Sequence, residues 1–272
     1  MNRVCHKVVS TFFFLYNLKE VSDMSNLDKV LQVISVGLIV AGFLLNTNRL
    51  LKAIELCKEC LFILKEGAGI KEEKLRKSLY IRIYFMMWKA CNGISEKTNA
   101  LKYAEKLLQI YRESGERLEE YKLSLELGEM YFSQSKYKQA KQLHEKALLI
   151  SKTIGDRYGE ACCYQTLGNV YISVGEYDKA RNHHEKSLVI KKEIGDRNGE
   201  ASSYMHLGIV YLSIGNYDKA REHQKKSLAI KIEIGDRKGE ASCYINLGNV
   251  YQSVGEYDMA REHYRKSLEV KK

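Results

Sequence analysis

A repeat of 40 residues dominates the downstream half of this 272-residue chain. Shifting residues 159–198 by 40 positions lays them on residues 199–238 with most positions identical. A fixed period of this size is typical of a solenoid, in which each unit packs only against its neighbours. The repeated positions include a leucine followed by glycine, at Leu127, Leu167, Leu207 and Leu247.

Within one unit the apolar spacing is helical. Tyr164, Leu167, Gly168 and Tyr171 lie at i, i+3, i+4 and i+7, which places them on one helix face. A second helical stretch runs from position 177 to about 194, and the chain contains no proline that would interrupt either helix. We therefore expect two helices per unit, separated by glycine turns.

These residues resemble the tetratricopeptide repeat (TPR) family over residues 119–272. The motif positions that carry the resemblance are Tyr164, Leu167, Gly168, Tyr171, Ala180 and Ser187. The resemblance implies an all-α fold, a right-handed α-solenoid of stacked antiparallel helix pairs. The segment KKEIGDRNGEA, followed by LGIVY, is similar to the 40-residue subtype of the Pins/LGN proteins, which are adaptors in cell polarity and spindle orientation.

The chain departs from the family pattern at the end of the second helix, where TPR units usually carry proline. Lys152, Lys192, Ile232 and Lys272 stand there instead, and a Gly-Asp-Arg turn replaces the stop. The Pins/LGN resemblance also implies C-terminal motifs that bind G-protein α subunits, and this sequence contains none.

The upstream half fits the repeat frame less well. Residues 81–120 match it, except that Trp88 occupies the glycine position and Cys91 a tyrosine position, and residues 34–70 match it once more. We interpret both as degenerate repeats. The predicted organisation is an N-terminal apolar segment (1–24), degenerate helical repeats (25–118) and a regular array (119–272) that ends within a repeat.

Both ends of the sequence raise alternatives. Residues 30–48 carry no charge, but they contain polar residues and satisfy the repeat frame through Val40, Ala41 and Leu44, so we favour a buried first helix over a membrane span. The apolar stretch 8–18 has no small-residue cleavage site after it, and Met24 is an alternative start to Met1. The array stops at Lys272 inside a helix, which predicts either a fragment or an end-to-end contact through the uncapped last repeat.

Composition excludes several classes of protein. The net charge of +10 is spread along the chain with both signs interspersed, which argues against a specific nucleic-acid partner. Seven cysteines without a disulfide framework indicate a reducing, cytoplasmic location. Cys57 and Cys60 lack a second pair at ligand spacing, and His183, His223 and His263 recur too far apart to share zinc. We predict no enzyme, cofactor or metal, because no catalytic motif is present.

The predicted architecture offers a concave groove along the first helices of the repeats. Its floor is expected to alternate polar and apolar residues, and arginines are expected at its rim to pair with carboxylates. The predicted groove and rim residues are Gln165, Asn169, Ile172, Met205, Ile209, Leu212, Ile245, Asn249, Gln252, Arg157, Arg197 and Arg237.

These features favour a non-enzymatic scaffold or adaptor, in signalling or cell polarity, whose groove holds an extended acidic peptide of a partner protein. Two alternatives stay open. One is a membrane-tethered scaffold that uses the apolar segments at 8–18 and 30–48. The other is an RNA-binding helical repeat, which rests only on the isoelectric point of about 9.1.

Overall fold

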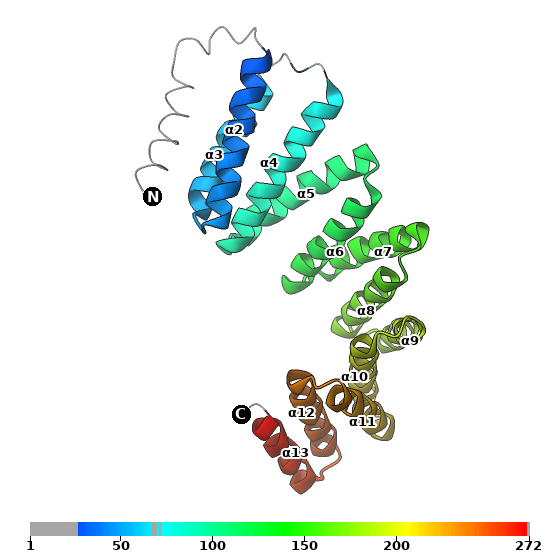
Figure 1. Cartoon of the computed structure of the whole chain (residues 1–272). Helices are drawn as coiled ribbons and strands as arrows, with labels where there is room; N and C mark the ends of the chain where they lie inside the picture. The colour runs from blue at the N-terminus through cyan, green and yellow to red at the C-terminus, as the bar shows by residue number, and fades with distance from the viewer. Residues whose placement is uncertain (1–26, 67–69, 71, 271–272) are drawn as a thin grey trace. The chain divides into compact units, whose positions relative to one another are not determined.

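The computed structural model describes residues 27–66, 70 and 72–270, and the predicted segment 1–24, with its apolar stretch and Met24, lies outside them. The described residues form twelve α-helices and no strand, which confirms the all-α prediction (Figure 1). The helices are α2 Leu27–Asn46, α3 Leu50–Glu66, α4 Glu73–Gly93, α5 Lys97–Ser114, α6 Arg117–Ser133, α7 Tyr137–Ile154, α8 Arg157–Ser173, α9 Tyr177–Glu193, α10 Arg197–Ser213, α11 Tyr217–Glu233, α12 Arg237–Ser253 and α13 Tyr257–Val270.

The chain divides into two compact units, Met1–Arg117 and Leu118–Lys272, which we call the upstream and the downstream unit. In the downstream unit α8 packs on α9, α10 on α11 and α12 on α13, and each of these pairs packs on the next. In Figure 1 α8, α10 and α12 lie on the inner side of this unit's curve, and α9 and α11 lie on its outer side. The downstream unit is therefore the stack of antiparallel helix pairs that the repeat predicts.

Glycine and aspartate build the turns between the pairs. Gly195 closes α9 in the left-handed conformation (φ 71°), which glycine adopts without steric cost. Asp196 then caps α10, because its side chain accepts a hydrogen bond of 2.8 Å from the backbone N–H of Gly199. The Gly-Asp-Arg sequence thus ends one helix and starts the next. This is the role predicted for it in place of the proline found in other TPR units.

The helices of a pair approach closely at the repeated glycine. A Cβ atom added to Gly168 would lie 2.6 Å from the ring of His184, which is fully buried on α9. Near this contact Leu167, Tyr171 and Ala180 form one core cluster with Val210 of the following pair. The close approach explains why a small residue recurs at this position.

We predict that Gly168→Ala lowers the free energy of unfolding by about 1–3 kcal/mol, because the added methyl group overpacks against His184. An exposed helical glycine would instead gain about 1 kcal/mol on the same change. Urea denaturation followed by circular dichroism measures the difference. The penalty should disappear in a His184→Ala background, and a Gly168→Ala protein as stable as the parent would refute the close contact.

The upstream unit contains two further helix pairs, α2 with α3 and α4 with α5. Trp88 is buried at the glycine position of α4, with 3% of its surface exposed. Ile34, Leu38, Ala41 and Leu44 form the buried face of α2, as expected for a packed first helix, and Val40 is half-buried. None of the helices in the described residues combines the length and the apolar character needed to cross a membrane.

Candidate functional site

Three inner helices of the downstream unit, α8, α10 and α12, each expose a single stripe of residues, whereas the equivalent positions of α6 include the charged Lys122, Glu126 and Glu129. On α8 the residues from Gly159 to Tyr171 are buried, except for four that lie on one helix face. The same pattern recurs on α10 and, with more exposure, on α12. We call these residues the inner stripe: Cys162, Gln165, Thr166, Asn169, Ile172, Ser202, Met205, His206, Ile209, Leu212, Ser242, Ile245, Asn246, Asn249 and Gln252.

All the predicted groove residues lie on the inner stripe. The helix α10, with Met205 and Ile209, contacts both α8 and α12, so the three rows of side chains are neighbours. Two stripe residues per helix were not predicted: Cys162 and Thr166 on α8, Ser202 and His206 on α10, and Ser242 and Asn246 on α12. The spacing i, i+4 from Cys162 to Thr166 was the available signal.

A row of polar side chains from the outer helices lies beneath the stripe. His184 of α9 stacks on His206 of α10, with ring centroids 5.0 Å apart. Gln224 of α11 donates a hydrogen bond of 2.9 Å to the backbone carbonyl of Met205, and it accepts one of 3.5 Å from Asn246. The stripe is therefore supported by the outer helix of its own pair and by that of the preceding pair.

At the last described pair the hydroxyl of Tyr264 reaches two amide side chains of the stripe. It lies 2.8 Å from the Oδ1 atom of Asn249 and 2.8 Å from the Oε1 atom of Gln252. The hydroxyl has one proton and donates it to one of these oxygens at a time, and the amide that accepts it keeps its N–H groups to donate to a ligand. Gln165 and Asn169 make no hydrogen bond through their side chains to other described residues, so they offer both a donor and an acceptor.

No lysine, arginine, aspartate or glutamate occurs among the fifteen residues of the inner stripe. Its histidine is also neutral at pH 7, because burial lowers the pKa of His206. The pKa of His184 beneath it lies well below the ordinary value, through burial and through the neighbouring His206. The stripe is an uncharged surface on a chain in which 29% of residues are charged.

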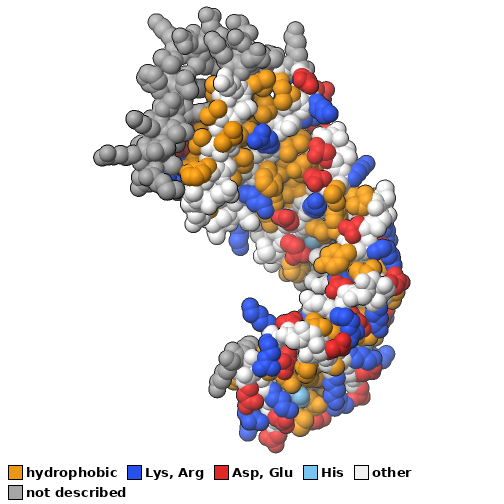
Figure 2. All heavy atoms as spheres, viewed as in Figure 1, with side chains coloured by type: hydrophobic (Ala, Val, Ile, Leu, Met, Phe, Trp, Pro, Cys, Tyr) orange, Lys and Arg blue, Asp and Glu red, His pale blue; other side chains and the backbone are white. Residues whose placement is uncertain are grey.

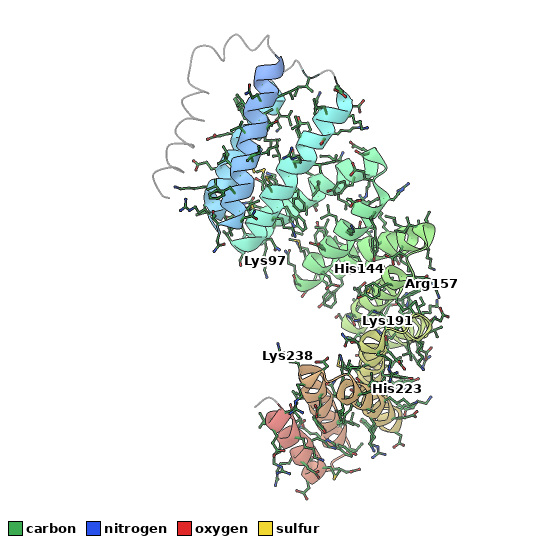
Figure 3. The ribbon with its side chains drawn as sticks, viewed as in Figure 1. Lys97, His144, Arg157, Lys191, His223 and Lys238 are labelled. Carbon is green, nitrogen blue, oxygen red and sulfur yellow. The ribbon has the colours of Figure 1, made fainter. Side chains whose placement is uncertain are left out.

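The rim arginines lie at the start of each inner helix (Figure 3 labels Arg157) and are held by glutamates of the same chain. Arg157 pairs with Glu160 at 2.7 Å and also with Glu193, and Arg197 pairs with Glu200 and Glu233 in the same way. Arg237 pairs with Glu240 at 3.3 Å, and its side chain is 68% exposed. Arg157 thus ties α8 to the end of α9, and Arg197 ties α10 to the end of α11, whereas the partner of Arg237 lies on its own helix α12.

Charges elsewhere on the downstream unit are mixed. Figure 2 shows lysine and arginine side chains interspersed with aspartate and glutamate over the visible face of this unit. Several lysines lie over tyrosine rings, such as Lys186 over Tyr164 at 5.6 Å. The visible face therefore carries no patch of one sign that would mark a nucleic-acid interface.

The cysteines and histidines singled out in the sequence have packing roles. Cys57 and Cys60 are fully buried, and burial raises the pKa of the Cys60 thiol to about 12. Such thiols stay protonated and unreactive at neutral pH. His183, His223 and His263 pack against tyrosines of the preceding inner helices: His223 stacks on Tyr211 and His263 on Tyr251, whereas the His183 ring is tilted against that of Tyr171, with centroids 5.0 Å apart. In the part of the chain that the structure describes, no group of three or more potential ligands is placed to hold a metal ion.

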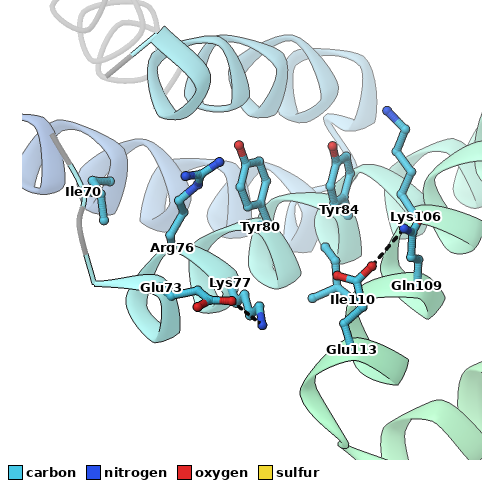
Figure 4. Close-up of a pocket in the computed structure, with 10 residues that line it drawn as sticks. All are labelled: Ile70, Glu73, Arg76, Lys77, Tyr80, Tyr84, Lys106, Gln109, Ile110 and Glu113. Atoms are coloured by element: carbon cyan, nitrogen blue, oxygen red, sulfur yellow. Dashed lines mark hydrogen bonds and ion pairs between the residues drawn. The ribbon is translucent and has the colours of Figure 1, made fainter. Parts of the chain in front are cut away.

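The upstream unit contains a separate cleft of about 680 Å³ between α4 and α5. Tyr80 and Tyr84 stack at 6.0 Å along α4, with Arg76 over the first ring and Lys106 over the second (Figure 4). Two carboxylates also line the cleft, so charges of both signs face it.

Comparison with known proteins identifies the repeat. The family model described as tetratricopeptide repeat matches residues 119–193 and 195–272. The chain belongs to the tetratricopeptide repeat family. A TPR protein of this kind is a scaffold for protein–protein interaction, and proteins of the family are generally non-enzymatic.

A comparison with curated proteins finds no match. Among solved structures the chain is similar to BtubC (BKLC) from P. vanneervenii, at 18% identity and a TM-score of 0.64, over 82% of this TPR chain and 91% of that one. It is also similar to a signal transduction ATPase with numerous domains and a tetratricopeptide repeat sensor from Pyrococcus horikoshii, at 20% identity and a TM-score of 0.70, over 98% of this chain and 41% of that one. The apo form of RapI matches at 16% identity and a TM-score of 0.62, over 88% and 97% of the two chains. At these identities the likeness concerns the fold.

Proposed function

We propose that the TPR chain is a non-enzymatic adaptor whose inner stripe holds an extended segment of a partner protein. The observation that carries this proposal is the recurrence of one exposed stripe on three neighbouring helices whose other faces are buried. The amides of Gln165 and Asn169 are available to pair with the backbone of an extended segment, which needs both donors and acceptors.

The Pins/LGN-like subtype, a role in signalling or cell polarity, and a cytoplasmic location belong to the same proposal. The subtype is supported by the period of 40 residues and by the capped Gly-Asp-Arg turn, repeated at Asp156, Asp196 and Asp236.

We keep the three rim arginines as the edge of the proposed site. Arg157 and Arg197 each face two glutamates, which neutralise much of their charge. Arg237 has one such partner at 3.3 Å and is the most exposed of the three, so it has the greatest capacity for an acidic residue of the segment.

An end-to-end contact through α13 also stays a proposal. Leu268 is 63% exposed on this last described helix, whereas Leu188 and Leu228 at the equivalent positions are half-buried. If copies associate through this face, Leu268→Glu should remove the concentration dependence of the sedimentation coefficient. A coefficient that does not vary with concentration in the parent chain would overturn the contact.

The alternatives receive no support from the site. An RNA-binding groove tracks phosphates with lysines and arginines, and the inner stripe has neither. The membrane-tethered alternative loses residues 30–48 as a span, because Ile34, Leu38 and Leu44 of α2 are buried against neighbouring helices.

We predict that Asn169→Ala combined with Asn249→Ala weakens the binding of a partner segment about tenfold, because each lost amide removes a net contribution of about 1 kcal/mol or less. The probe is a nonapeptide selected from a displayed random library against the full chain, and the readout is fluorescence anisotropy. Val189→Ala on the outer helix α9, where the side chain is 55% exposed, is the control and should leave affinity unchanged. Equal affinities of the double variant and the parent would contradict the proposed function.

A further inference from the structure

The middle of the inner stripe differs in chemistry from its two sides. On α10 the stripe carries Met205, Ile209 and Leu212, so three of its five residues are aliphatic or thioether side chains. On α8 and α12 isoleucine is the sole large apolar residue of the stripe, at Ile172 and Ile245. Amide side chains occupy two of the five positions on α8 and three on α12.

Ile209 marks the change most sharply. It stands at the repeat position that asparagine occupies on both sides, at Asn169 and Asn249. Ile209 is half-buried, as Asn169 is, so the substitution presents apolar surface where its neighbours present an amide. Leu212 packs against the core cluster that contains Leu207 and Tyr211. Met205 and Ile209 are therefore the apolar surface that a ligand can cover.

From these observations, and resting on the proposed function, we propose that the segment held by the inner stripe is uncharged at its centre, with apolar residues over α10 and polar uncharged residues over α8 and α12. Neighbouring helices lie about 8–10 Å apart, and an extended chain advances about 3.3 Å per residue. About three residues of the segment therefore lie over each inner helix, and about nine cover the stripe.

Desolvation sets the preference against charge at the centre. A carboxylate or ammonium group placed over α10 would lose water, and none of the fifteen stripe residues carries a charge to compensate it. An apolar side chain at the same place covers Met205 and Ile209, which is favourable. Charged residues of the segment fit only beyond the nine residues that cover the stripe, where Arg237 is exposed at the edge of α12.

Selection of random nonapeptides displayed on phage against the full chain tests the proposal. We expect the enriched peptides to carry aliphatic residues at the three central positions, with aspartate, glutamate, lysine and arginine depleted there. Their binding should fall about tenfold with the Ile209→Asn chain, which loses apolar contact but keeps a residue that this repeat position already accepts in two other units. Circular dichroism of the Ile209→Asn chain checks that its fold is unchanged.

The outcomes separate this inference from the proposed function. Two results would overturn the inference while leaving the inner stripe as the binding face. In the first, the peptides depend on Gln165 and Asn169 but carry charged residues at their centre. In the second, they bind the Ile209→Asn chain as tightly as they bind the parent chain. If no enriched peptide loses affinity on Gln165→Ala and Asn169→Ala, the proposed function fails, and the inference fails with it.

Discussion

Replacing Asp196 by alanine is expected to lower the free energy of unfolding by about 3–5 kcal/mol, because it leaves a buried cation without its counter-charge. Asp196 accepts one hydrogen bond from the backbone of Gly199 and one of 2.8 Å from the ammonium group of Lys191. Lys191, which is labelled on α9 in Figure 3, is only 3% exposed, so water cannot replace the lost carboxylate at low cost. Urea denaturation of the full chain measures the loss.

The chain supplies its own control for this prediction. Asp156 makes the same cap, accepting 2.8 Å from the backbone of Gly159, but Ser151 stands where the next repeat has Lys191. Asp156→Ala should therefore cost about 1 kcal/mol, the usual value of a lost cap. Equal losses in the two variants would contradict the role of the buried Lys191, whereas Lys191→Ser should reduce the penalty of Asp196→Ala.

Acidification from pH 7.5 to pH 5 is expected to destabilise the TPR fold by about 2 kcal/mol through His144 alone. Burial lowers the pKa of His144 from 6.5 to about 4, and the pKa of His184 is also lowered well below its ordinary value by burial. Between pH 6.5 and 4 the unfolded chain binds a proton that the folded chain does not bind. Stability is therefore complete above pH 6.5 and falls as pH decreases.

Glutamine provides the matched variant, because Gln224 occupies the same repeat position as His144 and His184. The variant His144→Gln with His184→Gln should show a flatter dependence of the unfolding midpoint on pH between 7.5 and 5. Burial raises the carboxyl pKa of Glu129, which makes the folded chain more stable as pH falls and so opposes the effect of the histidines. Both the variant and the parent contain Glu129, so the difference between their pH profiles reports the histidines. Parallel pH profiles of variant and parent would contradict the assignment to these two histidines.

Much of the fold was predictable because the repeat shows which positions need a small residue. The recurring glycine at 168 marks a close helix contact, and the predicted glycine turn is confirmed by the left-handed conformation of Gly195. The packed first helix was also predictable, since the apolar residues of α2 recur at helical spacing. Local physical rules fix these features within one unit.

Other features depend on contacts between units that one sequence does not reveal. The stacking of His184 on His206 joins two helix pairs, and nothing in the spacing of either residue indicates the partner. Likewise, the repeat frame predicts arginines at the rim but does not indicate that Arg157 reaches Glu193 on the following outer helix, 36 positions later in the chain. The cleft beside Tyr80 lies in the upstream unit, where the sequence fits the repeat frame less well and gives no template for it.

Photo-crosslinking tests most directly whether the inner stripe is the binding face. A benzophenone amino acid is placed at position 169 or 209 of the stripe in the full chain, and at position 189 on the outer face of α9 as the control. A library-selected nonapeptide should crosslink to positions 169 and 209 and give no adduct at position 189. Adducts at position 189 with none at the two stripe positions would contradict binding at the inner stripe.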